Sequence, residues 1–267
     1  MGCGAIGTAL AAAIERDDAK RARVVALTDS DPRAATTLRR RLASRPAIVS
    51  LPELVRRSHL VIEAASGAVA GRVARLALAS HRDVLIMSTG GLLTDPSWRR
   101  VVRRSRGRLV APSGALAGID GAKAMAVGAI RRVRLTTTKP PRALAGAPFV
   151  LAKRWDLARL RRRTILFEGP PAQVVKGFPQ NANVAATLWL ASGGLARGRR
   201  PSVTVRVVAD PSARVNRHDL ELQGDCGQIR CVVESRPSAK NPKTSELAIR
   251  SALAALEQLM TPIQIGT

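Results

Sequence analysis

Tyrosine is absent from this chain of 267 residues, and aromatic side chains make up only 2% of it. A hydrophobic core must therefore be built from Ala, Val, Leu and Ile, and the hydrophobic content of 46% is sufficient for one. The scarcity of aromatic side chains also argues against a protein that stacks bases of single-stranded nucleic acid. No apolar run approaches the length of a membrane span, and we expect no targeting leader.

Cysteine and histidine are scarce too, with three of each. Cys3, Cys226 and Cys231 do not have the spacing of a disulfide framework, or of a zinc site with histidine partners. We therefore expect no metal site, and we expect a soluble protein of the cytoplasm.

Acidic residues are greatly outnumbered, because the chain has 19 Asp and Glu but 44 Lys and Arg. Its formal net charge is therefore +25. Such a charge attracts nucleic acid, anionic membranes or acidic small molecules. Only seven of the basic residues are lysine, and the arginines are scattered in short clusters. A codon-driven preference for arginine explains this pattern more simply than a nucleic-acid site does, so nucleic acid is not the expected partner.

A phosphate-binding glycine turn opens the chain. Gly2, Gly4 and Gly7 form a complete GxGxxG pattern, followed by an alanine-rich helix over Thr8–Glu15. Gly2 permits the tight turn, Gly4 lets the backbone approach a pyrophosphate, and Gly7 allows close packing of helix and strand. The expected cofactor-binding segment also includes Ala5 and Ile6 within this turn.

An acid stands where a dinucleotide-binding domain needs one. Asp29 ends the apolar run Val24–Thr28, about 20 residues after the glycine turn, where a carboxylate binds the adenosine ribose. This favours NAD, although Arg33 nearby could accept the 2′-phosphate of NADP. The strand that should precede Gly2 is missing. We expect either a translation start upstream of Met1 or a damaged, inactive copy, and we favour the first.

Helices and apolar strands alternate through the first half. This pattern predicts a Rossmann-type α/β domain with a parallel sheet, whose ligands bind at the carboxyl ends of the strands. Expected strands are 47–49, 60–64, 84–87 and 109–111, and expected helices are 32–43, 52–57, 69–80 and 96–106. From about residue 116 the strands alternate apolar and polar residues (131–138, 164–168, 203–208, 215–222 and 228–234), which predicts a second α+β domain with a mixed or antiparallel sheet.

The last predicted helix begins with Asn241 as N-cap and Pro242 at its first position, and it runs to about Met260. Its apolar face should return to the first domain. We therefore expect a dinucleotide-binding domain over 1–115 plus 240–267, and a substrate or catalytic domain over 116–239.

The candidate catalytic base is His218. Alternation places His218, Asn216, Leu220 and Leu222 on the covered face of a strand. A histidine there is more often a hydrogen-bonded core residue, but no other histidine of this chain is as well placed to act as a base near neutral pH. Asn183, beside the possible helix cap Asn181, could bind a nicotinamide carboxamide.

Two cations are candidate carboxylate ligands. Lys139 ends a strand just before two prolines, and Lys243 lies at the start of the last helix, where free backbone amides favour anions. A buried dicarboxylate needs about two such sites, because an unpaired buried charge is very costly.

Several motifs together resemble the L-aspartate dehydrogenases. They are GCGAIG at the start, Ser113–Ala115 followed by Gly118–Asp120, Lys139–Pro140, FPQNANVAAT, Asn216–His218 and NPKTS. The resemblance covers nearly the whole chain and implies a two-domain enzyme that oxidises L-aspartate with NAD or NADP, and we expect a homodimer. It implies iminosuccinate as product, used by quinolinate synthase in NAD biosynthesis or hydrolysed to oxaloacetate and ammonia. It further implies His218 at the active site, and Ala115 and Asn183 at the cofactor.

Two other interpretations stay open at this point. One is another two-domain NAD(P)-dependent dehydrogenase, of the homoserine or dihydrodipicolinate type. The other is a basic nucleic-acid-binding protein that has kept a dehydrogenase-like fold.

Overall fold

The computed structural model describes residues 1–17, 20–179, 182–195, 201–236, 238 and 245–266. The chain divides into two compact units. Unit 1 comprises Met1–Pro112 and Ile249–Gln264, and unit 2 comprises Ser113–Ala248 and Ile265–Thr267. Among the described residues, no helix is both long and apolar enough to cross a membrane.

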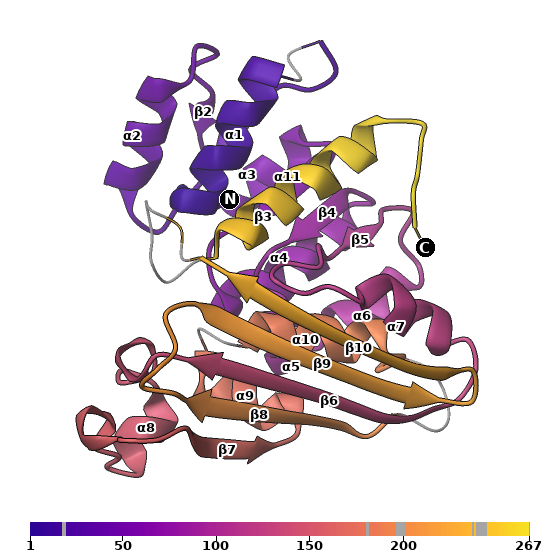
Figure 1. Ribbon diagram of the computed structural model, residues 1–267. Helices are drawn as coiled ribbons and strands as arrows, with labels where there is room; N and C mark the ends of the chain where they lie inside the picture. Colours follow the sequence, from indigo (N-terminus) through magenta and orange to yellow (C-terminus); the bar gives the residue numbers. More distant parts are fainter. Residues whose placement is uncertain (18–19, 180–181, 196–200, 237, 239–244, 267) are drawn as a thin grey trace. The chain divides into compact units, whose positions relative to one another are not determined.

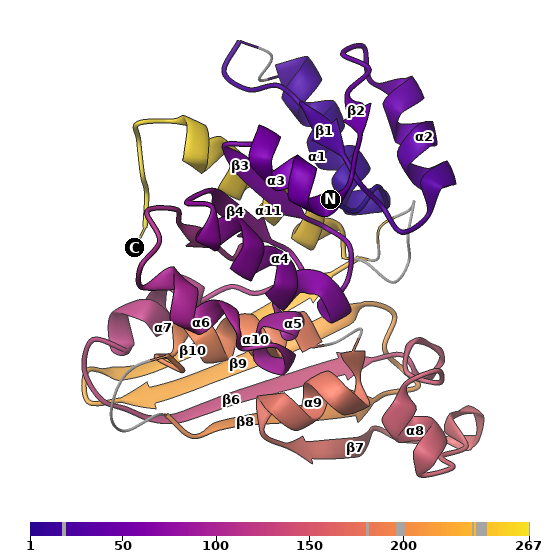
Figure 2. The same cartoon turned by 180° about the vertical axis from the view of Figure 1, so that it is seen from behind.

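Unit 1 alternates helices with short parallel strands (Figures 1 and 2). Its strands pair as β1–β2 and as β3–β4–β5, all in parallel. This confirms the predicted Rossmann-type sheet. The elements are α1 (Ala5–Asp17), β1 (Ala26–Leu27), α2 (Pro32–Arg41), β2 (Ala47–Ile48), α3 (Leu51–Arg57), β3 (Leu60–Glu63), α4 (Gly67–Ala79), β4 (Asp83–Ile86), α5 (Gly90–Thr94), α6 (Trp98–Val102) and β5 (Leu109–Val110).

One helix prediction in unit 1 was wrong in extent. The helix expected over 96–106 is only α6, and the chain turns at Arg103, so the four arginines at 99, 100, 103 and 104 do not share one helix. A second helix, α5, which the sequence pattern did not predict, begins at Gly90. Gly91 is needed there because a side chain would collide with the carbonyl oxygen of Gly67 at the start of α4.

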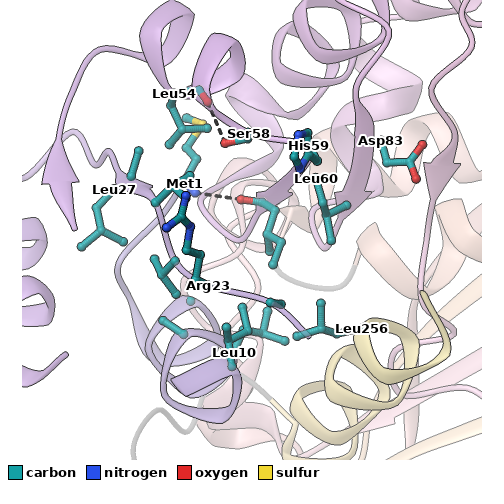
Figure 3. A pocket seen from close by; sticks show the side chains of 18 of the residues that line it. Met1, Leu10, Arg23, Leu27, Leu54, Ser58, His59, Leu60, Asp83 and Leu256 are labelled. Carbon is teal, nitrogen blue, oxygen red and sulfur yellow. Dashed lines mark hydrogen bonds between the residues drawn. The ribbon is translucent and has the colours of Figure 1, made fainter. Parts of the chain in front are cut away.

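The parallel sheet of unit 1 is interrupted between β1 and β3. Within the described part of the chain, only Met1 and Gly2 span the interruption: the amino group of Met1 donates to Ile62 O (2.8 Å), Ala64 N donates to Met1 O (2.9 Å), and Gly2 N donates to Thr28 O (2.9 Å). Beyond them lies a groove of about 600 Å³ (Figure 3). No strand of the described residues fills this position, where the sequence pattern predicted a strand ahead of Gly2.

Apolar side chains line much of the groove and continue into the core of unit 1. Leu10 of α1 lies on one side and Leu60 of β3 on the other, and Leu256 of α11 (Glu246–Met260) closes one end (Figure 3). Leu10 and Leu256 also pack with the buried side chains of Leu85 and Ala252. The last helix therefore contributes apolar side chains to the core of unit 1.

Unit 2 is built on one continuous five-stranded sheet, in the order β10-β9-β6-β8-β7. β6 and β8 are parallel and the other neighbours are antiparallel, which confirms the predicted mixed sheet. The elements are α7 (Ile119–Met125), β6 (Ile130–Lys139), η1 (Pro141–Ala143), α8 (Pro148–Ala152), η2 (Leu157–Arg159), β7 (Thr164–Gly169), α9 (Pro171–Gly177), α10 (Ala182–Ala191), β8 (Val203–Ala209), β9 (Asn216–Gly224) and β10 (Gly227–Ser235).

The two faces of this sheet differ in chemistry. Helices α7, α9 and α10 cover one face (Figure 2), where Leu135, Val205 and Leu220 lie in a single apolar core. The opposite face carries ion pairs, among them Arg206–Glu168 at 2.7 Å. Alternation along each strand separates the two sets of side chains, so a polar residue on the covered face needs a specific reason.

Candidate active site

The glycine turn of unit 1 has the geometry expected of a phosphate-binding turn. Gly2 has a positive φ of 83°, and a side chain at Gly7 would collide with the carbonyl oxygen of Gly2. Gly4 is exposed, and a Cβ built on it meets no atom within 4 Å. The backbone is therefore open where a pyrophosphate has to approach, at the start of α1, which also contains Ala5 and Ile6.

Asp29 is anchored to this turn. Its carboxylate accepts hydrogen bonds from Cys3 N (2.6 Å) and Asp31 N (2.9 Å). Burial raises the pKa of Asp29, but these hydrogen bonds outweigh burial and lower the pKa below its ordinary value. Asp29 is therefore an ionised acceptor at the end of β1, beside the glycine turn, as a ribose-binding acid must be.

Glu63 is a buried acid that the sequence pattern concealed within an apolar run. It ends β3 and is fully buried, and it accepts hydrogen bonds from Ala65 N (2.8 Å), Ser88 N (2.9 Å) and Ser88 Oγ (2.9 Å). Burial raises its pKa, and these hydrogen bonds offset part of that rise. Glu63 thus ties together the chain segments that leave β3 and β4, at the edge of the sheet where ligands bind.

His218 lies on the covered face of unit 2, as predicted, with 4% of its surface exposed. Its Nδ1 is 3.0 Å from Oγ1 of Thr137, the residue directly across from it on β6. Burial, together with the nearby positive charge of Lys139, lowers the pKa of His218 to about 4. The imidazole is therefore neutral at physiological pH, and one of its two ring nitrogens carries no proton.

Lys139 ends β6 on the same face, two residues after Thr137. Burial lowers the pKa of its ammonium group to about 8, so most of the population is still charged at pH 7. Lys139 is followed by Pro140 and the short η1 segment, which confirms the strand end and rigid turn expected there. A positive charge beside a neutral imidazole can hold an anionic ligand next to a base.

Two further polar side chains lie in the row of the sheet next to His218. Asn216 begins β9 and is buried, and Ser235 ends β10 directly across from it. Extending the β6–β9 register by one residue beyond Thr138 and Arg217 brings Lys139 opposite Asn216. The covered face of unit 2 is thus apolar along most of its length and polar at one corner.

Ala115 and Asn183, the two candidate contacts to the nicotinamide, both belong to unit 2. Ala115 is buried near the start of unit 2, and Asn183 is exposed in the first turn of α10. Asn181, Asn241, Pro242 and Lys243 lie outside the described residues. The described residues contain no cluster of His, Cys, Asp or Glu that could hold a metal ion, and the cysteines are free thiols.

Comparison with known proteins decides the family. The family "Aspartate dehydrogenase, C-terminal" matches residues 120–259, which is more than half of the chain. The chain belongs to the aspartate dehydrogenase family. An L-aspartate dehydrogenase of Methanosarcina barkeri is 40% identical over 273 residues, covering 100% of this chain and 98% of that protein. Another, L-aspartate dehydrogenase 3 of Bordetella bronchiseptica, is 34% identical, with 100% and 96% covered.

The first half and the fold agree with this assignment. Residues 2–106 match the NAD-binding domain of homoserine dehydrogenase. The crystal structure of aspartate dehydrogenase from Thermotoga maritima superposes with a TM-score of 0.62 at 27% identity, covering 78% of each chain. The resemblance to the aspartate dehydrogenase family drawn from the sequence motifs is therefore confirmed.

Sequence reasoning missed three polar residues at the strand ends: Glu63, Thr137 and Ser235. An acid inside an apolar strand was a signal for Glu63, because a buried carboxylate must find hydrogen-bond donors. Thr137 and Ser235 gave no local signal, because hydroxyl side chains are common on strands. Their importance depends on which residues face them across the sheet.

Proposed function

We propose that this chain oxidises L-aspartate to iminosuccinate with NAD or NADP as hydride acceptor, and that it uses His218 as the base. The observation that carries the proposal is the polar corner of unit 2, where a neutral buried imidazole lies beside a largely charged lysine. The relatives of this chain are named L-aspartate dehydrogenases. The polar corner offers an amino dicarboxylic acid a cation for one carboxylate and an acceptor for a proton.

Unit 1 is the dinucleotide-binding domain in this proposal, with boundaries close to 1–115 plus 240–267, and unit 2 is the substrate domain. Gly2, Gly4 and Gly7 present backbone to the pyrophosphate, and Asp29 binds the adenosine ribose. The open space at Gly4 and the ionised Asp29 both fit such a cofactor. The bound nicotinamide supplies a two-electron acceptor for hydride. Ala115 and Asn183 are proposed contacts at the nicotinamide end.

In unit 2, Lys139 holds one carboxylate of aspartate, and Asn216 donates its amide hydrogens to the substrate. Lys243 is proposed to hold the other carboxylate. His218 takes a proton from the substrate ammonium group, which leaves a neutral amine. A nicotinamide bound by unit 1 would accept the hydride of Cα, which would leave the protonated imine; two electrons and one proton would then go to the cofactor and one proton to the imidazole of His218.

We also propose the setting of this reaction: a cytoplasmic homodimer that delivers iminosuccinate to quinolinate synthase before the imine hydrolyses to oxaloacetate and ammonia. The chemistry of the product supports the delivery, because an imine in water is short-lived. The dimer is tested by light scattering of the purified protein. Nucleic acid is not proposed as a partner.

The test is a substrate panel with the purified chain. Reduction of NAD and of NADP is followed by absorbance with L-aspartate, D-aspartate, L-glutamate and L-homoserine in parallel. We expect turnover with L-aspartate and at least tenfold less with L-glutamate and L-homoserine, because a site built for a buried carboxylate at one fixed distance rejects longer or neutral side chains. We expect the same with D-aspartate, because binding both of its carboxylates at the same two sites turns its Cα hydrogen away from the hydride acceptor. Turnover of L-homoserine in preference to L-aspartate would overturn the proposal.

A further inference from the structure

The ring of His218 has two nitrogens, and only one of them is engaged within the described part of the chain. Nδ1 is 3.0 Å from Oγ1 of Thr137, and both side chains are almost fully buried, Thr137 with 1% of its surface exposed. The two residues are direct cross-strand partners on β6 and β9. Their contact is therefore fixed by the sheet register, not by a movable loop.

This contact can exist in two forms. If the threonine hydroxyl donates to Nδ1, the proton of the neutral ring is on Nε2, and the nitrogen that faces away from Thr137 cannot accept another. If Nδ1–H donates to Oγ1, the lone pair is on Nε2 and the ring can act as a base there. Oxidation of an amine requires the second form, because a proton must leave the ammonium group before hydride leaves Cα.

We propose that Thr137 is a positioning residue that accepts the Nδ1–H hydrogen bond of His218, so that Nε2 is the proton acceptor of the reaction. The proposal rests on the function proposed above. Thr137 acts only through the imidazole, by fixing its tautomer and its rotation about the Cβ–Cγ bond. A third group that orients a histidine base in this way is a recurring arrangement in enzymes.

The test compares Thr137→Val, Thr137→Ser and Thr136→Val. Valine keeps the shape and removes the hydroxyl, so kcat should fall about tenfold or more while KM for L-aspartate stays within about twofold. Serine restores the acceptor and should return kcat to within about threefold of the parent enzyme. Thr136 is the matched control, because it lies on the opposite face of β6, paired with Asp219, and its replacement should leave kcat unchanged.

A second readout does not depend on turnover. The ¹⁵N chemical shifts of the His218 ring should show Nδ1 protonated in the parent protein and a mixture of tautomers in Thr137→Val. Nε2 protonated in the parent protein, or an unchanged kcat in Thr137→Val, would overturn the proposal. If the chain does not oxidise aspartate at all, the proposed function fails, but the tautomer measurement still decides the role of Thr137.

An independent observation concerns Ser235. Its side chain is buried, with 6% of the residue exposed, and its Oγ has no hydrogen-bond partner among the described residues. A buried hydroxyl without a partner is destabilising, so it calls for an explanation. Ser235 lies across from Asn216 on the covered face, in the row of the sheet that Lys139 also reaches.

We infer that Ser235 donates its hydroxyl hydrogen to a carboxylate of the substrate, beside Lys139 and Asn216. This extends the proposed aspartate site by one residue on β10. An anion held by a cation and by neutral donors is bound in a defined orientation, which a single lysine cannot ensure.

The test is Ser235→Ala with Ser192→Ala as its matched control. Ser192 follows α10 and also has a buried hydroxyl without a partner in the described chain, but it is not on this sheet. Ser235→Ala should raise KM for L-aspartate about five- to tenfold at nearly unchanged kcat. It should weaken inhibition by succinate, a dicarboxylate without an amine, by a similar factor.

Equal effects of Ser235→Ala and Ser192→Ala, or no effect of Ser235→Ala on either constant, would overturn this inference. Succinate binding can be measured by calorimetry without turnover. A chain that binds succinate through Ser235 but does not oxidise aspartate would therefore contradict the proposed function and leave this contact standing.

Discussion

The two units position functional groups by different means. In unit 2 an unbroken five-stranded sheet sets the site, because the register of β6, β9 and β10 alone decides that Thr137 faces His218 and that Ser235 faces Asn216. In unit 1 the sheet is interrupted by the groove, and carboxylate side chains hold the functional segments in place. Asp29 holds the glycine turn through Cys3, and Glu63 joins β3 to β4 through Ser88.

Substitutions should therefore have different effects where strand hydrogen bonds position the site and where single carboxylate side chains, here called anchors, position it. Backbone ladders tolerate the loss of one side chain, so a substitution in unit 2 should change chemistry with little change in fold. Anchors are single carboxylates with several donors each, and the backbone contact at Gly7 leaves no room for a side chain, whereas Gly4 is open. Substitutions in unit 1 should therefore separate into those that disturb the fold and those that disturb only the ligand.

The largest expected effect is in unit 2. His218→Ala should lower kcat by roughly 10²–10⁴, the range typical of general acid–base catalysis, while the dissociation constant of NAD stays unchanged. Steady-state kinetics and fluorescence titration of NAD measure the two quantities. His59→Ala is the control, since His59 is exposed at the groove of unit 1 and should leave kcat unchanged (Figure 3). Parent-like kcat in His218→Ala would remove this residue from the mechanism.

The next effect separates fold from ligand in unit 1. Gly7→Ala places a methyl group against the carbonyl oxygen of Gly2, so both the melting temperature and the affinity for NAD should fall. Gly4→Ala places the methyl group in open space, so NAD affinity should fall at least tenfold with an unchanged melting temperature. Calorimetric melting and NAD titration of both variants check this, and equal melting temperatures would contradict it.

A smaller effect, on the melting temperature, is expected when the groove is filled by an added strand. Five apolar, strand-forming residues fused ahead of Met1 should extend the ladder that Met1 and Gly2 begin between β1 and β3, and cover apolar surface. We expect the melting temperature to rise by several degrees and NAD affinity to improve. A fused segment of the same length made of Gly and Ser is the control. If both fusions melt alike, the groove does not accept a strand.

The smallest expected effect concerns the charge beside His218. Burial is the main cause of its lowered pKa, and the ammonium group of Lys139 lowers it further, because a positive neighbour disfavours protonation. Lys139→Met removes that charge and should raise the pKa of His218 above about 4, by one unit or less, so that it stays below that of a free histidine. Proton NMR titration of the ring measures it. Lys176→Met, at an exposed position of α9, should leave it unshifted.

Much of the fold could be predicted because it depends on local patterns. Continuous apolar strands between helices indicated the parallel sheet of unit 1, and alternating strands indicated the mixed sheet of unit 2. The same patterns were wrong about the helix over 96–106, where Gly107 approaches the backbone of Arg82 too closely for any side chain. That contact joins distant segments, and no local pattern contains it.

For the site, the amino-acid pattern was sufficient to predict the glycine turn, the acid at the end of β1 and the covered face on which His218 lies. These follow from spacing and from the two-residue period of a strand. Which groups meet at the site depends on the folded sheet. Thr137 and His218 are 81 residues apart, and Ser235 comes from a third strand. Pairing register is set by the packing of the whole sheet against its helices, so neighbours across strands become known only once the chain has folded.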